Sequence, residues 1–231
     1  MIYLWYIFVA LLPGLFWLWF YRRKDRQNPE PLKQIFKIFV WGMAATIPAI
    51  ALEFSADFFI PYASSTKYLA MVLSSFLIVA PIEEFFKYLV LKHKAAESKE
   101  FNEPIDGIIY GIVVGLGFAT LENFLVTLSD GGTVIILRFA TATLMHAICS
   151  GIVGYYLARQ KFHPQGNKSS VMKGLFLAIF LHGLYNSVAS YNSSYSIILL
   201  AILIIVMYLM LSQDIKAIKR LKITAQQNNQ E

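Results

Sequence analysis

Five ionisable side chains lie inside the hydrophobic stretches of this 231-residue sequence. They are Glu83, Glu84, Glu122, His146 and His182. A charge within a membrane span is energetically expensive, so each side chain is expected to face a bundle interior or a wet cavity. Histidine nitrogens and carboxylate oxygens bind catalytic zinc in proteins, while a separate carboxylate serves as general base. The set therefore predicts a metal-dependent hydrolytic site within a membrane.

Each polar group has an expected role in such a site. The expected metal ligands, with Zn2+ as the ion, are Glu122, His146 and His182, and the expected catalytic group is Glu83, Glu84, Lys87 and Asn186. Glu83 or Glu84 would act as the base, and Lys87 or Asn186 would polarise the carbonyl under attack or orient a ligand. The soluble zinc-protease signature H-E-x-x-H is absent from the chain.

Small residues share helix faces with these polar groups, which indicates where the faces point. Three stripes of residues recur at four-residue spacing. The first is Gly107, Gly111 and Gly115, and Glu122 follows on the same face. The second is Ala142, His146, Ser150 and Gly154, and the third is Gly174, Ala178, His182 and Asn186. Small-residue stripes let two membrane helices approach closely. We therefore expect Glu122, His146 and His182 to point into the bundle.

A kinked helix is expected to carry the paired acids. Pro81 removes a helical hydrogen bond just before them. Glu83 and Lys87 are four residues apart, with the acid first, which favours an ion pair. Glu84 is about 100° further round the helix, so the two acids do not aim equally well at one point.

The elements that hold these residues are predicted to be membrane-spanning helices. The sequence is 57% hydrophobic and 15% charged, against about 25% charged in soluble domains. Apolar runs of about 20 residues recur along the chain, and they are 2–20, 34–54, 68–91, 107–128, 133–158, 171–190 and 195–212. The expected fold is an all-α membrane bundle of about seven transmembrane helices, with eight as the alternative count.

Basic residues alternate between the loops of this bundle. The first, third and fifth loops and the tail carry most of them, while the other loops hold Lys67, with Arg138 just inside the following span. The positive-inside rule then places the N-terminus outside and the C-terminus in the cytoplasm. It also explains the net charge of +6 without a nucleic-acid partner. Residues 1–213 form one expected domain, and 214–231 a polar cytoplasmic tail that ends in disorder.

Several segments resemble the PrsW family of bacterial membrane proteases. They are PIEEFFK at 81–87, EPIDGIIYGIVVGLGFATLENF at 103–124, the span of His146, LHGLYN at 181–186 and NPEPLKQIF at 28–36. The resemblance covers nearly the whole chain in order. Its most specific part is GFATLEN joined to the upstream DGIIYG.

The resemblance implies an intramembrane metalloprotease of the bacterial plasma membrane, related to the CAAX-protease and bacteriocin-processing superfamily. Its substrate would be a single-span membrane protein such as an anti-sigma factor, cut at the first site of a stress response. The family motifs fall on Glu83, Glu84 and Lys87, on Phe118 and Glu122, and on His182. The last motif ends in aspartate in the family, whereas this chain has Asn186, the residue of the related CAAX-type proteases. Asparagine can only donate or accept hydrogen bonds.

Two other classes fit the same residues. An ion-coupled transporter would use them as a proton relay, and a non-catalytic immunity or adaptor protein would not need them. Transporters often contain paired broken helices, whereas only the third span has a central proline here. We expect Glu53, Asp57 and Arg138 to lie at the membrane interface, with their charged ends reaching the headgroups.

Overall fold

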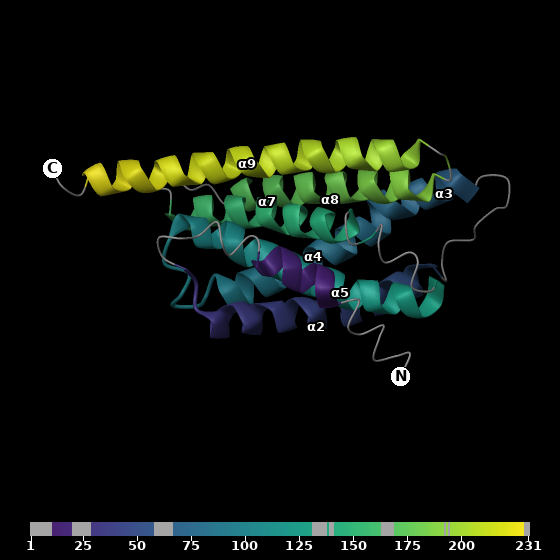
Figure 1. Cartoon of the computed structure of the whole chain (residues 1–231), viewed down its shortest axis with the longest axis horizontal. Coiled ribbons are helices and arrows are strands. Elements are labelled where there is room, and N and C mark those ends of the chain that lie inside the picture. The colour runs from purple at the N-terminus through teal and green to yellow at the C-terminus, as the bar shows by residue number, and fades with distance from the viewer. Residues whose placement is uncertain are drawn as a thin grey trace.

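The computed structural model describes residues 11–19, 29–57, 67–130, 138, 141–162, 169–191, 193 and 195–228, and within these ranges it contains helices and no strand. Residues 11–19 are helical, and the labelled helices are α2 (Leu32–Asp57), α3 (Lys67–Ser74), α4 (Ala80–Val90), α5 (Pro104–Asp130), α7 (Ala142–Phe162), α8 (Ser169–Ser190) and α9 (Ser196–Asn228). Two π-helical turns, η2 (Ser75–Val79) and η3 (Leu91–Ala95), flank α4. The long helices run along one axis, with α9 and α2 on opposite edges (Figure 1).

Among the described residues, five helices are long and apolar enough to cross a membrane. Their ranges are Leu32–Ala56, Lys67–Ala95, Pro104–Leu128, Ser170–Ser190 and Ser196–Arg220, and they confirm five of the expected spans. The first expected span, 2–20, is helical over 11–19, and residues 1–10 lie outside the described part. These helices indicate a membrane protein whose regular structure, in the part of the chain described, is all helical.

One expected boundary falls mostly outside the described residues, and another was wrong. The fifth span was expected to begin at 133; its helix α7 begins at Ala142, and of residues 133–140 only Arg138 is described. The side chain of Arg138 bonds to Asn123 on α5. The polar end of the chain was expected to be disordered, but α9 continues to Asn228. Good helix formers such as Lys, Arg and Leu continue beyond the apolar part and extend the helix.

Glycines hold α5 against α7, as their spacing predicts. A methyl group at Gly107 would overlap the carbonyl oxygen of Gly154, and one at Gly111 would overlap that of Ser150. At Gly115 it would meet the carbonyl oxygen of His146. This contact fixes the height of His146 relative to α5. The helix α5 is also the most enclosed of the five spans, because 72% of its most apolar stretch of 18 residues is buried.

A π-helical turn precedes the paired acids. Pro81 has no N–H and its ring crowds the preceding turn, so a regular α-helix cannot continue through it. In the structure the preceding turn widens to the π form over Ser75–Val79, and α4 then begins at Ala80. Such π turns occur frequently at functional sites. The expected disturbance at Pro81 is therefore absorbed in the turn before it.

Candidate active site

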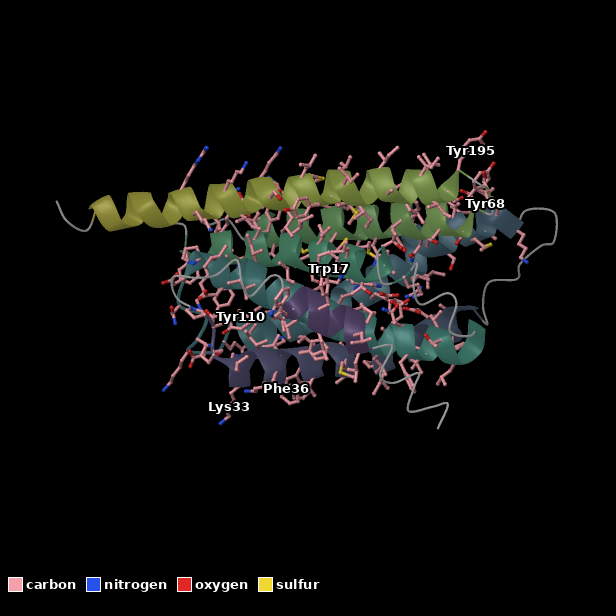
Figure 2. All side chains as sticks on the ribbon, in the orientation of Figure 1. Trp17, Lys33, Phe36, Tyr68, Tyr110 and Tyr195 are labelled. Atoms are coloured by element: carbon pink, nitrogen blue, oxygen red, sulfur yellow. The ribbon has the colours of Figure 1, made fainter. Side chains whose placement is uncertain are left out.

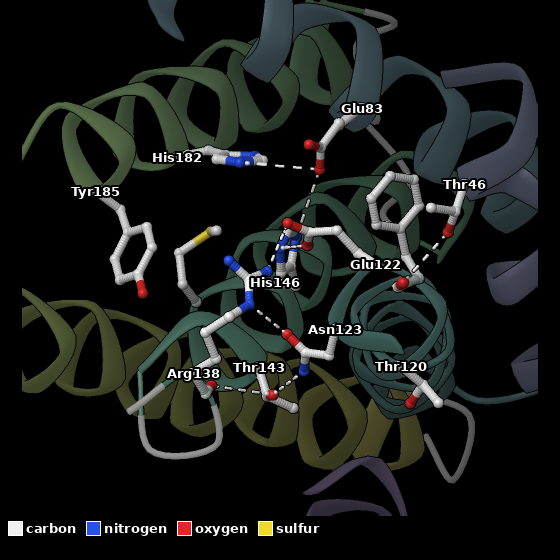
Figure 3. Close-up of polar contacts among 12 residues, drawn as sticks. Thr46, Glu83, Thr120, Glu122, Asn123, Arg138, Thr143, His146, His182 and Tyr185 are labelled. Carbon is white, nitrogen blue, oxygen red and sulfur yellow. Dashed lines mark hydrogen bonds and ion pairs between the residues drawn. The ribbon is translucent and has the colours of Figure 1, made fainter. Parts of the chain in front are cut away.

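The five intramembrane ionisable residues converge at the centre of the bundle. Glu83 and Glu84 come from α4, Glu122 from α5, His146 from α7 and His182 from α8. Figure 3 shows Glu83, Glu122, His146 and His182 pointing toward a common centre. The two histidine rings are 5.0 Å apart between centroids and nearly perpendicular. The expectation of one shared polar cluster is confirmed.

Glu84 holds both His182 and Lys87. Its Oε1 is 2.8 Å from Nδ1 of His182 and 2.6 Å from Nζ of Lys87. A carboxylate only accepts hydrogen bonds, so Nδ1 of His182 carries the proton and donates it. The lone pair of His182 is then on Nε2, which is the nitrogen that faces Glu83 at 3.8 Å.

His146 is held from both sides of its ring. Nζ of Lys87 lies 2.8 Å from Nδ1, and Oε2 of Glu122 lies 2.7 Å from Nε2. Lysine only donates and carboxylate only accepts, so Nδ1 is the acceptor and Nε2 carries the proton. Phe118 packs on the ring, with 5.6 Å between centroids, and also lies under Lys87 at 4.5 Å. The lone pair of Nδ1 is therefore engaged by Lys87, and Oε2 of Glu83 lies 3.7 Å from the same nitrogen.

The expected Glu83–Lys87 ion pair is present, but Lys87 lies closer to Glu84. Nζ of Lys87 is 3.4 Å from Glu83 and 2.6 Å from Glu84. The side chains of all three residues are 6% exposed or less. Because the lysine compensates two buried carboxylates at once, it is a central member of the cluster.

Glu83, His146 and His182 fit a metal ion. One ligand atom of each lies within 4.8 Å of the other two, and Oε2 of Glu83 is 3.7 Å from Nδ1 of His146 and 3.8 Å from Nε2 of His182. Donors around tetrahedral zinc are about 3.3 Å apart, given bonds of about 2.0–2.1 Å. Oε2 of Glu83 is also buried without a hydrogen-bond partner among the described residues. Binding of zinc by this set would require small inward shifts and the withdrawal of Nζ of Lys87, which lies 2.8 Å from Nδ1 of His146 and 3.4 Å from Oε2 of Glu83.

Glu122, the expected third ligand, lies on the other side of His146. Its contact with Nε2, at 2.7 Å, leaves no room for an ion between the two atoms. A carboxylate beyond a metal-binding histidine is the arrangement that fixes the ring's tautomer and orientation in known metal sites. Glu84 stands in the same relation to His182. The role of Glu122 as a metal ligand stays a prediction. The distances make Glu83 the alternative carboxylate ligand.

Arg138 joins the cluster, although we expected it to lie at the membrane interface. It donates to Oε1 of Glu122 at 2.5 Å and to Oδ1 of Asn123 at 2.6 Å. Asn123 in turn donates to Thr143, at 2.9 Å. The expectation for Arg138 was wrong, because its side chain pairs with Glu122 and is 19% exposed. The sequence does show a basic residue at position 138, but no helical periodicity links Arg138 to Glu122.

Two further residues differ in their relation to the cluster. Asn186 lies on α8 one turn after His182 and is half-buried, and it makes no hydrogen bond to another described side chain. Its expected catalytic role stays a prediction. Glu53, expected at the interface, lies close enough to Glu83 for the two charges to repel. Glu53, four residues before the end of α2, thus belongs to the surroundings of the cluster.

Exposure differs sharply across the cluster. The side chains of Glu83, Glu84, Lys87, His146 and His182 are between 0% and 6% exposed. Those of Glu122 and Arg138 are 21% and 19% exposed. The cluster is therefore closed on most sides, and its accessible edge is the Glu122–Arg138 pair.

Known proteins are similar in sequence to this chain over most of its length. A family model described as PrsW family intramembrane metalloprotease matches residues 30–212. The chain is 32% identical to "Protease PrsW" of Geobacillus kaustophilus, over 78% of this chain and 77% of the relative. It is 31% identical to "Protease PrsW" of Clostridioides difficile, over 87% and 84% of the two chains, and 29% identical to that of Halalkalibacterium halodurans, over 92% and 96%. No solved structure matches. With its buried carboxylates and histidines inside a helical membrane bundle, the chain is a peptide hydrolase that belongs to the PrsW family of intramembrane metalloproteases.

Proposed function

We propose that this chain is a zinc-dependent endopeptidase of the bacterial plasma membrane. Its substrate would be a single-span membrane protein such as an anti-sigma factor, cut within or beside the bilayer. The observation that carries the proposal is the approach of Glu83, His146 and His182 to within 4.8 Å of one another, inside the bundle. A buried site of this kind requires a substrate that is itself embedded in the membrane.

The two histidines and Glu83 would hold the ion in this proposal. When bound, zinc would supply Lewis acidity, which polarises the carbonyl under attack and lowers the pKa of water. Glu84 and Glu122 orient the histidines through Nδ1 of His182 and Nε2 of His146. This arrangement retains the two histidine ligands expected from sequence and exchanges Glu122 for Glu83.

In this proposal Glu84 accepts a proton and Lys87 stabilises negative charge. Oε1 of Glu84 is engaged by His182 and Lys87, while its buried Oε2 has no hydrogen-bond partner among the described residues. That second oxygen accepts the proton of the attacking water, and Glu84 is therefore the general base. The Lys87 ammonium stabilises the negative charge that develops on the carbonyl oxygen. Arg138 is a positioning residue, since it acts through Glu122.

Zinc content separates the two ligand assignments. Purified protein in detergent is tested for bound zinc by elemental analysis and for cleavage of a single-span reporter. Glu83→Gln and His182→Ala should lose zinc, whereas Glu122→Gln should retain it with about 10- to 100-fold weaker affinity. Glu84→Gln should retain zinc and lose cleavage. Glu97→Gln, at a side chain that is 63% exposed, is the matched control.

The outcomes point in different directions. Loss of zinc in Glu122→Gln with retention in Glu83→Gln would restore the ligand set expected from sequence. A wild-type protein that cuts the reporter without any divalent metal, and in the presence of chelator, would overturn the zinc assignment. For the substrate, the test is a membrane protein that accumulates uncut when Glu83 and Glu84 are replaced together.

A further inference from the structure

A groove separate from the polar cluster opens between α2 and the α4–η3 segment. Its volume is about 390 Å³, within the range of about 300–1,000 Å³ for small-molecule sites. Its lining residues are Trp41, Ala44, Ala45, Pro48, Phe86, Leu89, Val90, His93 and Lys94. We refer to it below as the α2/α4 groove.

Both walls of the α2/α4 groove change from apolar to basic in the same direction. The α2 wall follows helical spacing from Pro48 back to Trp41, and Lys37 lies one turn before Trp41 on the same face. The other wall runs from Phe86 to Lys94, again with helical spacing. The groove is thus an apolar channel with lysines at one end.

The basic end is organised by specific contacts. Nζ of Lys94 lies 4.4 Å from the centroid of the Trp41 ring, a cation–π contact across the groove. The carbonyl oxygen of Lys94 accepts a hydrogen bond from Gln34 of α2, at 3.4 Å. His93 pairs with Glu97, at 2.8 Å, and no ion pair of Lys37 or Lys94 is found among the described residues, so these two lysines supply the positive charge at this end.

The basic end also lies at the membrane surface that carries the positive loops. Lys33, one turn before Lys37, lies at the end of the bundle opposite Tyr68 and Tyr195 (Figure 2). An aromatic ring and lysines at the end of an apolar channel match the depth profile of a phospholipid, with acyl chain below and headgroup above. Basic pockets between membrane helices on the cytoplasmic side bind anionic lipid headgroups.

We propose that the α2/α4 groove binds one anionic phospholipid, with an acyl chain between Trp41 and Phe86 and the phosphate beside Lys37 and Lys94. The charge of the groove end selects the anionic headgroup over a zwitterionic one. This site is independent of the proposed catalytic roles, because none of its lining residues is in the polar cluster.

Trp41 provides a direct reporter for this lipid. The full chain with Trp5, Trp17 and Trp19 changed to phenylalanine is placed in phosphatidylcholine nanodiscs. Brominated phosphatidylglycerol or brominated phosphatidylcholine is added at equal mole fractions, and quenching of Trp41 is measured. Quenching by phosphatidylglycerol should be about 25-fold more effective, and Lys94→Gln or Lys37→Gln should each reduce that preference about fivefold. The preference should also weaken as salt is raised.

Lys92→Gln is the matched control, because Lys92 is exposed and does not line the groove; the preference should persist in this variant. Ala44→Phe fills the groove and should reduce quenching by both lipids. Lipid retention in native mass spectrometry of the unaltered chain provides a second measurement that needs no tryptophan replacement. Equal quenching by the two lipids, equal retention, or an unchanged preference in both lysine variants would overturn the proposal, and would leave the groove to neutral lipid or a protein segment.

Discussion

Replacing Lys87 by methionine tests how the buried charges of the cluster are balanced. Its ammonium lies 2.6 Å from Glu84 and 3.4 Å from Glu83, and its side chain is 2% exposed. Methionine keeps an unbranched apolar chain of similar length, so the change removes mainly the charge. Removing one partner of a buried ion pair destabilises a protein by about 3–5 kcal/mol. We expect a loss of that size for Lys87→Met.

The measurement is the free energy of unfolding in mixed micelles, taken with chelator present so that no metal substitutes for the lost cation. The double variant Glu84→Gln/Lys87→Met removes both partners of the closer pair. Its loss should be smaller than the sum of the two single losses by about 1–3 kcal/mol, since the partners are in contact. Strict additivity would refute the argument that Lys87 and Glu84 stabilise each other.

The control for this cycle is Lys92→Met, on the same helical segment but exposed. A surface substitution of this kind should change stability by no more than about 0.5 kcal/mol. If Lys87→Met behaves like Lys92→Met, the buried lysine does not compensate the two carboxylates. The charge distribution derived from the distances would then be wrong.

Three further predictions concern the supports of the cluster. Gly111→Leu should force α5 and α7 apart, because even a methyl group there overlaps a carbonyl oxygen of α7; cleavage should be lost and thermal stability lowered in the same assays. Arg138→Gln should weaken zinc binding about tenfold through the loss of its 2.5 Å bond to Glu122, and Arg138→Lys should recover part of it; unchanged zinc affinity would mean that Arg138 does not act through the carboxylate. Tyr110→Phe removes the hydrogen bond to the buried carboxylate of Glu30 and should cost about 1–3 kcal/mol in the unfolding free energy, while the zinc content stays that of the wild type.

Helical periodicity explains what could be predicted from sequence. Gly107, Gly111 and Gly115 share a face because the helix repeat is rigid, and the same holds for His146, Ser150 and Gly154. Each stripe therefore had to meet a neighbouring helix, and the structure pairs them with each other. Convergence of Glu122, His146 and His182 follows from these local patterns alone.

Long-range register explains what could not be predicted. Which oxygen of Glu83 or Glu122 approaches which nitrogen depends on sliding and tilt between helices, and the sequence contains no periodic signal for either. The closer pairing of Lys87 with Glu84 likewise depends on the orientation of α4 after the π-helical turn at Ser75–Val79. Arg138 was missed for a related reason, since no helical periodicity relates it to Glu122, 16 residues earlier in the sequence.

The position of Arg138 bears on how water enters a site that hydrolyses peptide bonds. Glu84 and His182 are enclosed, whereas the contact between Glu122 and Arg138 is about one-fifth exposed. Water that reaches the histidines from this edge would pass Arg138 and Glu122, and Glu122 contacts Nε2 of His146. Under the proposed function, water access and the orientation of His146 would therefore depend on the same two side chains. Moving Arg138 away from this edge would also release Glu122, so the entry of water and the alignment of His146 would be coupled.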